Sequence, residues 1–142
     1  MKLVVASDEK THLTDSVVEH LKNKGHKLIL LGDLVKKDGK WVEIGKKAAE
    51  KVAKGEVDRG ILFCWSGTGI CMAANKIKGV RAALCWDTET ARLARKWDNA
   101  NILCMSLRYT SEELAKEILD AWFSAEFDEE GLNEVHKLED LF

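Results

Sequence analysis

Short β-rich runs alternate with helical patterns along the chain, and this alternation limits the possible folds more than any other feature. Five apolar, β-branched runs are typical of strands, at positions 2–6, 27–31, 59–64, 80–85 and 101–105. Apolar residues at helical spacing predict helices between and after them, at positions 13–25, 42–54, 73–75, 88–95 and 111–124. Residues 126–142 form an acidic, weakly helical tail. Repeated strand–helix units of this kind predict an α/β protein.

The same alternation predicts a three-layer αβα fold, Rossmann-like and doubly wound, around a five-stranded parallel sheet. Strands that are apolar over nearly their whole length are expected where helices cover both faces of the sheet. No repeat or linker interrupts the sequence, so we expect one domain over 1–142, with 126–142 as its C-terminal tail. In such a sheet, ligands bind outside the carboxyl ends of the strands, here residues 7–9, 64–69, 86–87 and 106–109.

Charge and hydropathy exclude several classes of partner. The chain has 22 Lys and Arg against 24 Asp and Glu, and no basic block dominates, so we expect no nucleic-acid partner. No apolar run approaches the ~20 residues of a membrane span, so we expect no membrane association. The cysteines lack the CxxC spacing of zinc and redox motifs, which predicts reduced thiols in a cytoplasmic protein: Cys64, Cys71, Cys85 and Cys104.

The stretch that follows the third predicted strand carries the clearest chemical signal. Cys64 ends the strand, and the turn Ser66-Gly67-Thr68-Gly69 leads into a helix. Backbone N–H groups at such a turn can hold a phosphate or a developing oxyanion. The same partial positive charge lowers the pKa of a thiol, which makes Cys64 a candidate base or nucleophile. The glycine pattern matches neither the Walker A motif nor the dinucleotide fingerprint.

Tryptophan is unusually frequent, since it supplies five of the ten aromatic residues. Large, semi-polar rings in a chain of this length indicate a lined pocket, with core filling as the alternative. The five are Trp41, Trp65, Trp86, Trp97 and Trp122.

Several segments in order resemble the ribose-5-phosphate isomerase B / galactose-6-phosphate isomerase family. The central match is 60–76, which contains the loop after Cys64 and the segment Ala73-Ala-Asn-Lys76. Further matches are Ser7-Asp8, residues 79–85, Asp87, residues 90–95, Asn101-Ile-Leu and residues 113–123. Together they cover essentially the whole chain.

This resemblance implies a metal-independent aldose–ketose isomerisation through a cis-enediolate, with no cofactor and a sugar or sugar phosphate as the substrate. It implies that Cys64 shuttles a proton between C2 and C1, while the Ser66–Gly69 loop stabilises the enediolate oxygens. Asp8 would lie near the sugar hydroxyls, and Asn75 in the substrate site. Arg108 matches an arginine that contacts the substrate phosphate, typically from the partner of a homodimer; a tetramer is the other assembly considered.

The sequence departs from the family pattern at several site positions. Glu9 replaces a histidine after the first strand, and Trp97, followed by Asp98-Asn99, replaces the histidine thought to open the sugar ring. Trp41 stands in place of a tyrosine, and Trp65 in place of a glycine. The basic phosphate motif near the C-terminus is replaced by residues 129–133, Glu-Glu-Gly-Leu-Asn.

These departures predict an altered substrate. Carboxylates in place of cations repel a phosphate dianion, so we expect a sugar other than ribose 5-phosphate, either unphosphorylated or differently substituted. Trp41, Trp65 and Trp97 would form the stacking walls of this pocket, and Asn99 would contribute beside them. Trp86 and Trp122 are expected to be structural. Ring opening needs another acid or base, for which the candidates are Asp8, Asp98 and His12.

Three functions remain open on sequence alone. The first is a sugar isomerase that uses Cys64. The second is a non-catalytic sugar-binding or regulatory protein on the same scaffold, without the ring-opening histidine. The third is a thiol hydrolase, against which the absence of a matched histidine near Cys64 argues.

Overall fold

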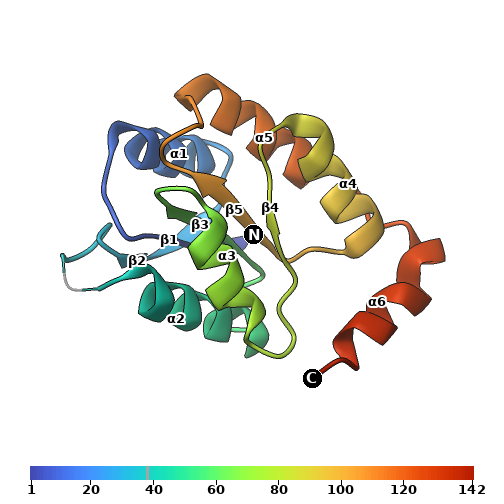
Figure 1. Ribbon diagram of the computed structural model, residues 1–142. Helices are drawn as coiled ribbons and strands as arrows, with labels where there is room; N and C mark the ends of the chain where they lie inside the picture. Colours follow the sequence, from blue (N-terminus) through green and yellow to red (C-terminus); the bar gives the residue numbers. More distant parts are fainter. Residues whose placement is uncertain (38) are drawn as a thin grey trace.

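The computed structural model describes residues 1–37 and 39–142, which form a parallel sheet covered by helices (Figure 1). The strands are β1 (Lys2–Ser7), β2 (Lys27–Gly32), β3 (Arg59–Cys64), β4 (Ala82–Leu84) and β5 (Ile102–Ser106). The helices are α1 (His12–Asn23), α2 (Trp41–Ala53), α3 (Thr68–Asn75), α4 (Thr88–Asp98), α5 (Glu112–Ser124), the 3-10 helix η1 (Glu129–Gly131) and α6 (Leu132–Glu139). The strand order is β2-β1-β3-β5-β4, with every pair parallel. The predicted α/β fold with a five-stranded parallel sheet is confirmed.

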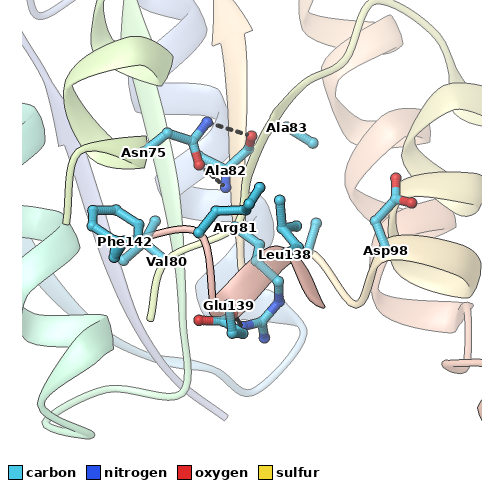
Figure 2. A pocket seen from close by; sticks show the side chains of 11 residues that line it. Asn75, Val80, Arg81, Ala82, Ala83, Asp98, Leu138, Glu139 and Phe142 are labelled. Carbon is cyan, nitrogen blue, oxygen red and sulfur yellow. Dashed lines mark hydrogen bonds and ion pairs between the residues drawn. The ribbon is translucent and has the colours of Figure 1, made fainter. Parts of the chain in front are cut away.

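The fourth strand is shorter than predicted, and side-chain amides bind backbone groups at its start. At its start, the Asn75 amide nitrogen donates to the Ala82 carbonyl oxygen at 2.9 Å, and the Ala82 N–H donates to the Asn75 Oδ1 at 2.8 Å (Figure 2). One residue earlier, the Arg81 N–H donates to Asn101 Oδ1 at 2.8 Å. Regular pairing with β5 covers only Ala82–Leu84 instead of 80–85, and the Asn75 amide pairs with the outer edge of β4, away from β5.

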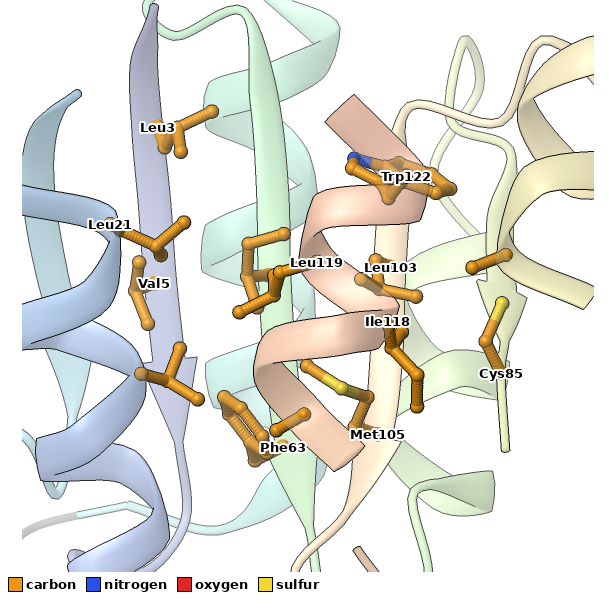
Figure 3. Packing of buried hydrophobic residues seen from close by; sticks show 14 of the residues in the cluster. Leu3, Val5, Leu21, Phe63, Cys85, Leu103, Met105, Ile118, Leu119 and Trp122 are labelled. Carbon is orange, nitrogen blue, oxygen red and sulfur yellow. The ribbon is translucent and has the colours of Figure 1, made fainter. Parts of the chain in front are cut away.

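Helices cover both faces of the sheet, as the doubly wound prediction requires. Side chains alternate between the faces along each strand: Leu3 and Val5 point to one face and Val4 to the other. The first face packs against α1, α4 and α5, where Leu21, Ile118, Leu119 and Trp122 fill the core (Figure 3). The second packs against α2 and α3. Both faces of β1, β3 and β5 are thus buried, which explains their continuous apolar runs.

Side-chain caps fix where three helices begin. Asp87 accepts from the Thr90 N–H at 2.7 Å at the start of α4, and Ser111 accepts from the Leu114 N–H at 3.1 Å at the start of α5. Both caps were expected from the sequence. Thr11 and Thr14 form a reciprocal capping box at α1.

The C-terminal half differs from the sequence prediction in two places. α4 continues to Asp98 rather than stopping near residue 95, and Asn99 ends it in the left-handed conformation, with φ 48°. The tail is better ordered than a weakly helical segment, since it contains η1 and α6. α6 lies beside the sheet core rather than on it (Figure 1), and an ion pair between Arg81 and Glu139 joins it to the start of β4.

Candidate active site at the carboxyl end of the sheet

The strand order brings the candidate residues together where the strands finish, which we call the carboxyl end of the sheet. Ser7 is paired with Phe63, and Cys64 with Ser106, so the chain leaves β1, β3 and β5 at similar heights. Neighbouring strands lie about 4.8 Å apart. The segments that follow β1, β3, β5 and β4 therefore form a row in that order.

Cys64 occupies the middle of this row. It is the last residue of β3, and its side chain is only 4% exposed, within the apolar cluster beneath α2 and α3. The chain turns directly after it and starts α3 at Thr68. The first N–H groups of a helix have no intrahelical acceptor and carry partial positive charge. The strand–turn–helix arrangement predicted from the sequence is therefore present, with α3 starting four residues after Cys64.

The turn needs glycine at two positions. Gly67 has φ +78°, and a Cβ there would lie 2.6 Å from Leu84 Cδ1 and 3.0 Å from the Met105 carbonyl carbon. Gly69 lies against Trp41, since a Cβ there would be 3.0 Å from that indole ring. Trp41 therefore packs directly on the loop and remains 41% exposed. Ser66 and Thr68 join their hydroxyls at 2.6 Å, which braces the same turn.

Asp8 lies half-buried at the end of β1. Burial raises the pKa of its carboxyl above the ordinary 3.8, the carboxylates of Glu9 and Asp33 raise it further, and a backbone hydrogen bond opposes them. Asp33, which follows β2, escaped the sequence analysis because no motif marks it. Its N–H donates to the Ser7 carbonyl oxygen at 2.9 Å, and its Oδ1 is buried without a hydrogen-bond partner among the described residues. A carboxyl with a raised pKa is suited to exchanging protons with sugar hydroxyls.

The segment after β5 is tied to the segment after β3. The Ser106 hydroxyl donates to the Trp65 carbonyl oxygen at 2.8 Å, and the Arg108 N–H donates to the same oxygen at 3.0 Å. Arg108 thus lies one strand from Cys64 in its own chain, rather than only in a partner. Trp65 projects outward from this junction and is 59% exposed.

Most predicted site residues lie at this end of the sheet. Glu9 and His12 are exposed, and His12 is the first residue of α1. The carboxyl end therefore holds Asp8, Glu9, His12, Trp41, Cys64, Trp65, Ser66, Gly67, Thr68, Gly69 and Arg108.

Four predicted site residues lie at the opposite, amino end of the sheet, because α3 and α4 run antiparallel to the strands. Asn75 ends α3 with both polar atoms of its amide bonded to Ala82. Trp97, Asp98 and Asn99 end α4 beside α6. A cavity of about 370 Å³ lies there, lined by residues that include Asn75, Asp98, Arg81, Leu138 and Phe142 (Figure 2). Asn75 also lines a second cavity with Thr68, from the turn after Cys64, whereas Trp97 and Asp98 line cavities with residues of α6.

The other cysteines lie in or beneath the sheet. Burial raises the pKa of the Cys85 thiol to about 12. Burial also raises the pKa of the Cys104 thiol, and its interaction with Cys71 lowers the pKa of Cys71, whose own thiol on α3 donates to the Ala82 carbonyl oxygen at 3.5 Å. Cys85 also comes just before a helix, α4, but its side chain is buried in the cluster on the other face of the sheet, so Cys64 remains the candidate base.

Two other kinds of feature are absent from the residues that the structure describes. Residues 1–37 and 39–142 contain no helix long and apolar enough to cross a membrane. The same residues contain no group of three His, Cys, Asp or Glu side chains placed to hold a metal ion.

Known proteins share both the sequence and the fold. The family model described as Ribose/Galactose Isomerase matches residues 3–141. The galactose-6-phosphate isomerase subunit LacB of Clostridium acetobutylicum is 43% identical over 113 residues, which is 78% of this chain and 64% of that protein. The D-erythrulose-4-phosphate isomerase of Pectobacterium atrosepticum is 42% identical over 101 residues, 71% of this chain and 65% of that protein. This chain thus spans just under two thirds of each of these relatives.

A solved structure agrees over nearly the full length. Ribose-5-phosphate isomerase B from Mycoplasma genitalium with bound ribulose-5-phosphate superposes with a TM-score of 0.90 at 36% identity, covering 98% of this chain and 94% of that one. The parallel sheet and these similarities define the class of α/β proteins to which the ribose-5-phosphate isomerase B named above belongs. Within that class, the chain belongs to the ribose/galactose isomerase family.

Proposed function

We propose that this chain is an aldose–ketose isomerase that moves a proton between C1 and C2 of a sugar or sugar phosphate through a cis-enediolate. The observation that carries the proposal is the placement of Cys64 directly before the turn that opens α3. The Cys64 base and the N–H groups of the first turn of α3 then face C1 and C2 of the same sugar. This is what an enediolate intermediate needs.

The reaction starts with ring opening. Asp8, whose raised pKa suits proton exchange, accepts the proton of the anomeric hydroxyl and delivers it to the ring oxygen as the bond between C1 and that oxygen breaks. In the opened aldose, the Cys64 thiolate takes the proton from C2, and the electrons of that bond form the C1–C2 double bond of the enediolate. N–H groups of the first turn of α3 stabilise the negative oxygen. Cys64 then returns its proton to C1, and the hydroxyl proton moves from O2 to O1, which gives the ketose.

The substrate is a short sugar. The positions of Glu129 and Glu130 change what is expected of a phosphate on it. The named relatives act on galactose 6-phosphate, D-erythrulose 4-phosphate and ribose 5-phosphate, which supports a sugar phosphate of four to six carbons. Glu129 and Glu130 lie in η1, next to the end of α4, where the Asp128 N–H donates to the Lys96 carbonyl oxygen at 2.7 Å. Their repulsion of a phosphate at Cys64 would therefore require a second subunit. Of the three glutamates, only Glu9 lies at the carboxyl end of the sheet in the same chain as Cys64.

Residues 1–142 act as one domain in a cytoplasmic homodimer on this proposal. The placement of Trp97, Asp98 and Asn99 at the amino end supports the dimer, because these residues reach a Cys64 site only in another copy. In this arrangement Asp98 supplies acid–base chemistry across the interface, and Trp97 and Asn99 contact the sugar.

Proton exchange tests the proposal directly. The protein is incubated in deuterated water with ribose 5-phosphate, galactose 6-phosphate, erythrulose 4-phosphate and the corresponding free sugars, and deuterium at C1 and C2 is followed by NMR. We expect incorporation with the wild type and a loss of about 10²-fold or more in Cys64→Ala. Unchanged exchange in Cys64→Ala would refute the role of Cys64. If no sugar exchanges while several raise the Tm, the chain is a sugar-binding protein.

A further inference from the structure

Two exposed aromatic rings lie at the carboxyl end of the sheet without a part in the proposed reaction. Trp86 follows β4 and is 46% exposed, and Tyr109 follows β5 and is 64% exposed. Their ring centroids are 5.6 Å apart, with the planes tilted by 38°. Trp122 is fully buried, as expected of a structural residue, whereas Trp86 is nearly half exposed.

The neighbouring Arg108 places a cation against this pair. Its guanidinium carbon lies 5.3 Å from the centroid of the Tyr109 ring. Among the ion pairs found for residues 1–37 and 39–142, none involves Arg108. Its charge is thus held by an aromatic face and stays available to an anion.

The position of this group relative to Cys64 is fixed by the backbone. The Tyr109 N–H donates to the Ser106 Oγ at 3.0 Å, and that hydroxyl donates to the Trp65 carbonyl oxygen at 2.8 Å. Because β5 lies between β3 and β4, Arg108 and Tyr109 are one strand from Cys64 and Trp86 is two, about 5 and 10 Å. This is the range over which a short open sugar extends from its reacting carbons to its far end.

We propose that Trp86 and Tyr109 are positioning residues that hold the Arg108 guanidinium for the terminal phosphate of a phosphorylated sugar. The inference rests on the proposed function, since it takes C1 and C2 to lie at Cys64. The Tyr109 face restricts the arginine side chain, and Trp86 supports that ring from the neighbouring strand. The Tyr109 ring covers one side of the cation, which strengthens its attraction to phosphate on the other.

Kinetics with matched substrates test this positioning role. Ribose 5-phosphate and free ribose are compared for the wild type, Tyr109→Leu, Tyr109→Phe and Trp86→Leu. We expect Tyr109→Leu and Trp86→Leu to raise the KM for ribose 5-phosphate by about 2- to 5-fold, the range of an exposed cation–π contact, with kcat within twofold. Tyr109→Phe keeps the ring and is expected to retain the wild-type KM. Kinetics with free ribose should not change.

Two outcomes would overturn the inference. One is an unchanged KM for ribose 5-phosphate in both leucine variants, or an equal change for free ribose. The other is a shift of oligomeric state in Tyr109→Leu, measured by sedimentation, which would show that the aromatic pair contacts a second copy instead.

A binding measurement separates this inference from the proposed function. Inorganic phosphate should raise the Tm of the wild type and of Cys64→Ala equally, and should raise that of Tyr109→Leu less. If no sugar exchanges deuterium but this pattern holds, the reaction is wrong and the phosphate subsite stands. If exchange occurs but phosphate protects Tyr109→Leu as well as the wild type, the positioning role is wrong.

Discussion

Asp8 shows how a single residue can serve catalysis at the expense of stability. Its carboxyl is half-buried beside Glu9 and Asp33, and this environment raises its pKa above 3.8. A group with a raised folded-state pKa binds its proton more tightly when folded. The folded state therefore loses stability as the pH rises from 3.8 through the raised value, and at pH 7 this loss is complete.

Replacement of Asp8 by asparagine should thus have opposite effects on activity and stability. Asp8→Asn removes the buried charge, so we expect the Tm at pH 7 to rise by about 2 °C, while kcat/KM falls by about 10²-fold. The gain in Tm should shrink below pH 3.8, where the wild-type carboxyl is protonated in both states. Thermal melts at the two pH values, with kinetics at pH 7, check this. A lower Tm at pH 7 would show that the asparagine loses a contact that the carboxylate makes.

Gly67 provides a second test at the residue scale, with Gly25 as its matched control. Both have positive φ, +78° and +88°, but a Cβ at Gly25 meets nothing within 4 Å. Gly25→Ala should therefore cost only the left-handed strain, about 1 kcal/mol of unfolding free energy. Gly67→Ala adds the clash with Leu84 and Met105 and should cost about 1–3 kcal/mol more, with loss of isomerase activity. Urea denaturation measures both, and equal costs would contradict the clash.

Sequence motifs identified the loop around Cys64 because the chemistry of that loop resides in consecutive residues. They could not identify Asp33, nor the contact of Trp86 with Tyr109. Asp33 reaches Asp8 only through the pairing of β1 with β2, and Trp86 reaches Tyr109 only because β4 lies beside β5. Contacts of this kind depend on strand order, which no local pattern in the sequence records.

At the scale of elements, Asn75 joins α3 to β4. The motif in which it lies led to its prediction as a substrate residue, yet its amide bonds both backbone groups of Ala82. A side chain that satisfies two backbone groups has little capacity left for a ligand. These two hydrogen bonds explain why the short helix α3 and the three-residue strand β4 stay aligned.

Asn75→Ala should accordingly affect stability more than binding. We expect the free energy of unfolding to fall by about 1–3 kcal/mol, because two hydrogen bonds are lost and the Ala82 groups become unpaired. The KM at a temperature well below the Tm should stay within about twofold, since less than 1 kcal/mol of binding is at stake. Urea titration and steady-state kinetics measure the two quantities. A large rise in KM with unchanged stability would restore the substrate-binding role.

The boundaries of elements were predictable where a side chain determines them. Asp87 and Ser111 mark helix starts in the sequence and in the structure, because a cap acts on residues only three positions away. The short β4 and the ordered α6 were not predictable. Their limits depend on Asn75, Asn101 and the Arg81–Glu139 ion pair, which join distant parts of the chain.

At the scale of the whole molecule, the predicted site is divided between the two ends of the sheet. Cys64 and Asp8 lie at the carboxyl end, whereas Asp98 and Trp97 end a helix that runs to the amino end. The resemblance to the family implies that these residues share one pocket. The strand–helix alternation alone places them at opposite ends of the sheet. A symmetric dimer reconciles the two, since each copy can offer its amino end to the other.

Mixing of inactive variants tests this arrangement. Cys64→Ala and Asp98→Ala protomers are unfolded, mixed in equal amounts and refolded. If the site takes Cys64 from one copy and Asp98 from the other, half of the dimers are mixed, and each mixed dimer holds one intact site. The recovered activity should reach about a quarter of the wild type. Recovery near zero, with mixed dimers demonstrated by mass spectrometry, would contradict a shared site.

The position of β4 also has a consequence for synthesis of the chain. β4 pairs only with β5, which follows it in the sequence but lies between it and β3. As the polypeptide leaves the ribosome, β1, β2 and β3 can associate at once, whereas residues 82–84 emerge well before their partner at 102–104. The apolar edge of β3 in the partly formed sheet therefore stays unpaired until β5 docks. During this interval the chain is most exposed to misfolding and most in need of chaperones.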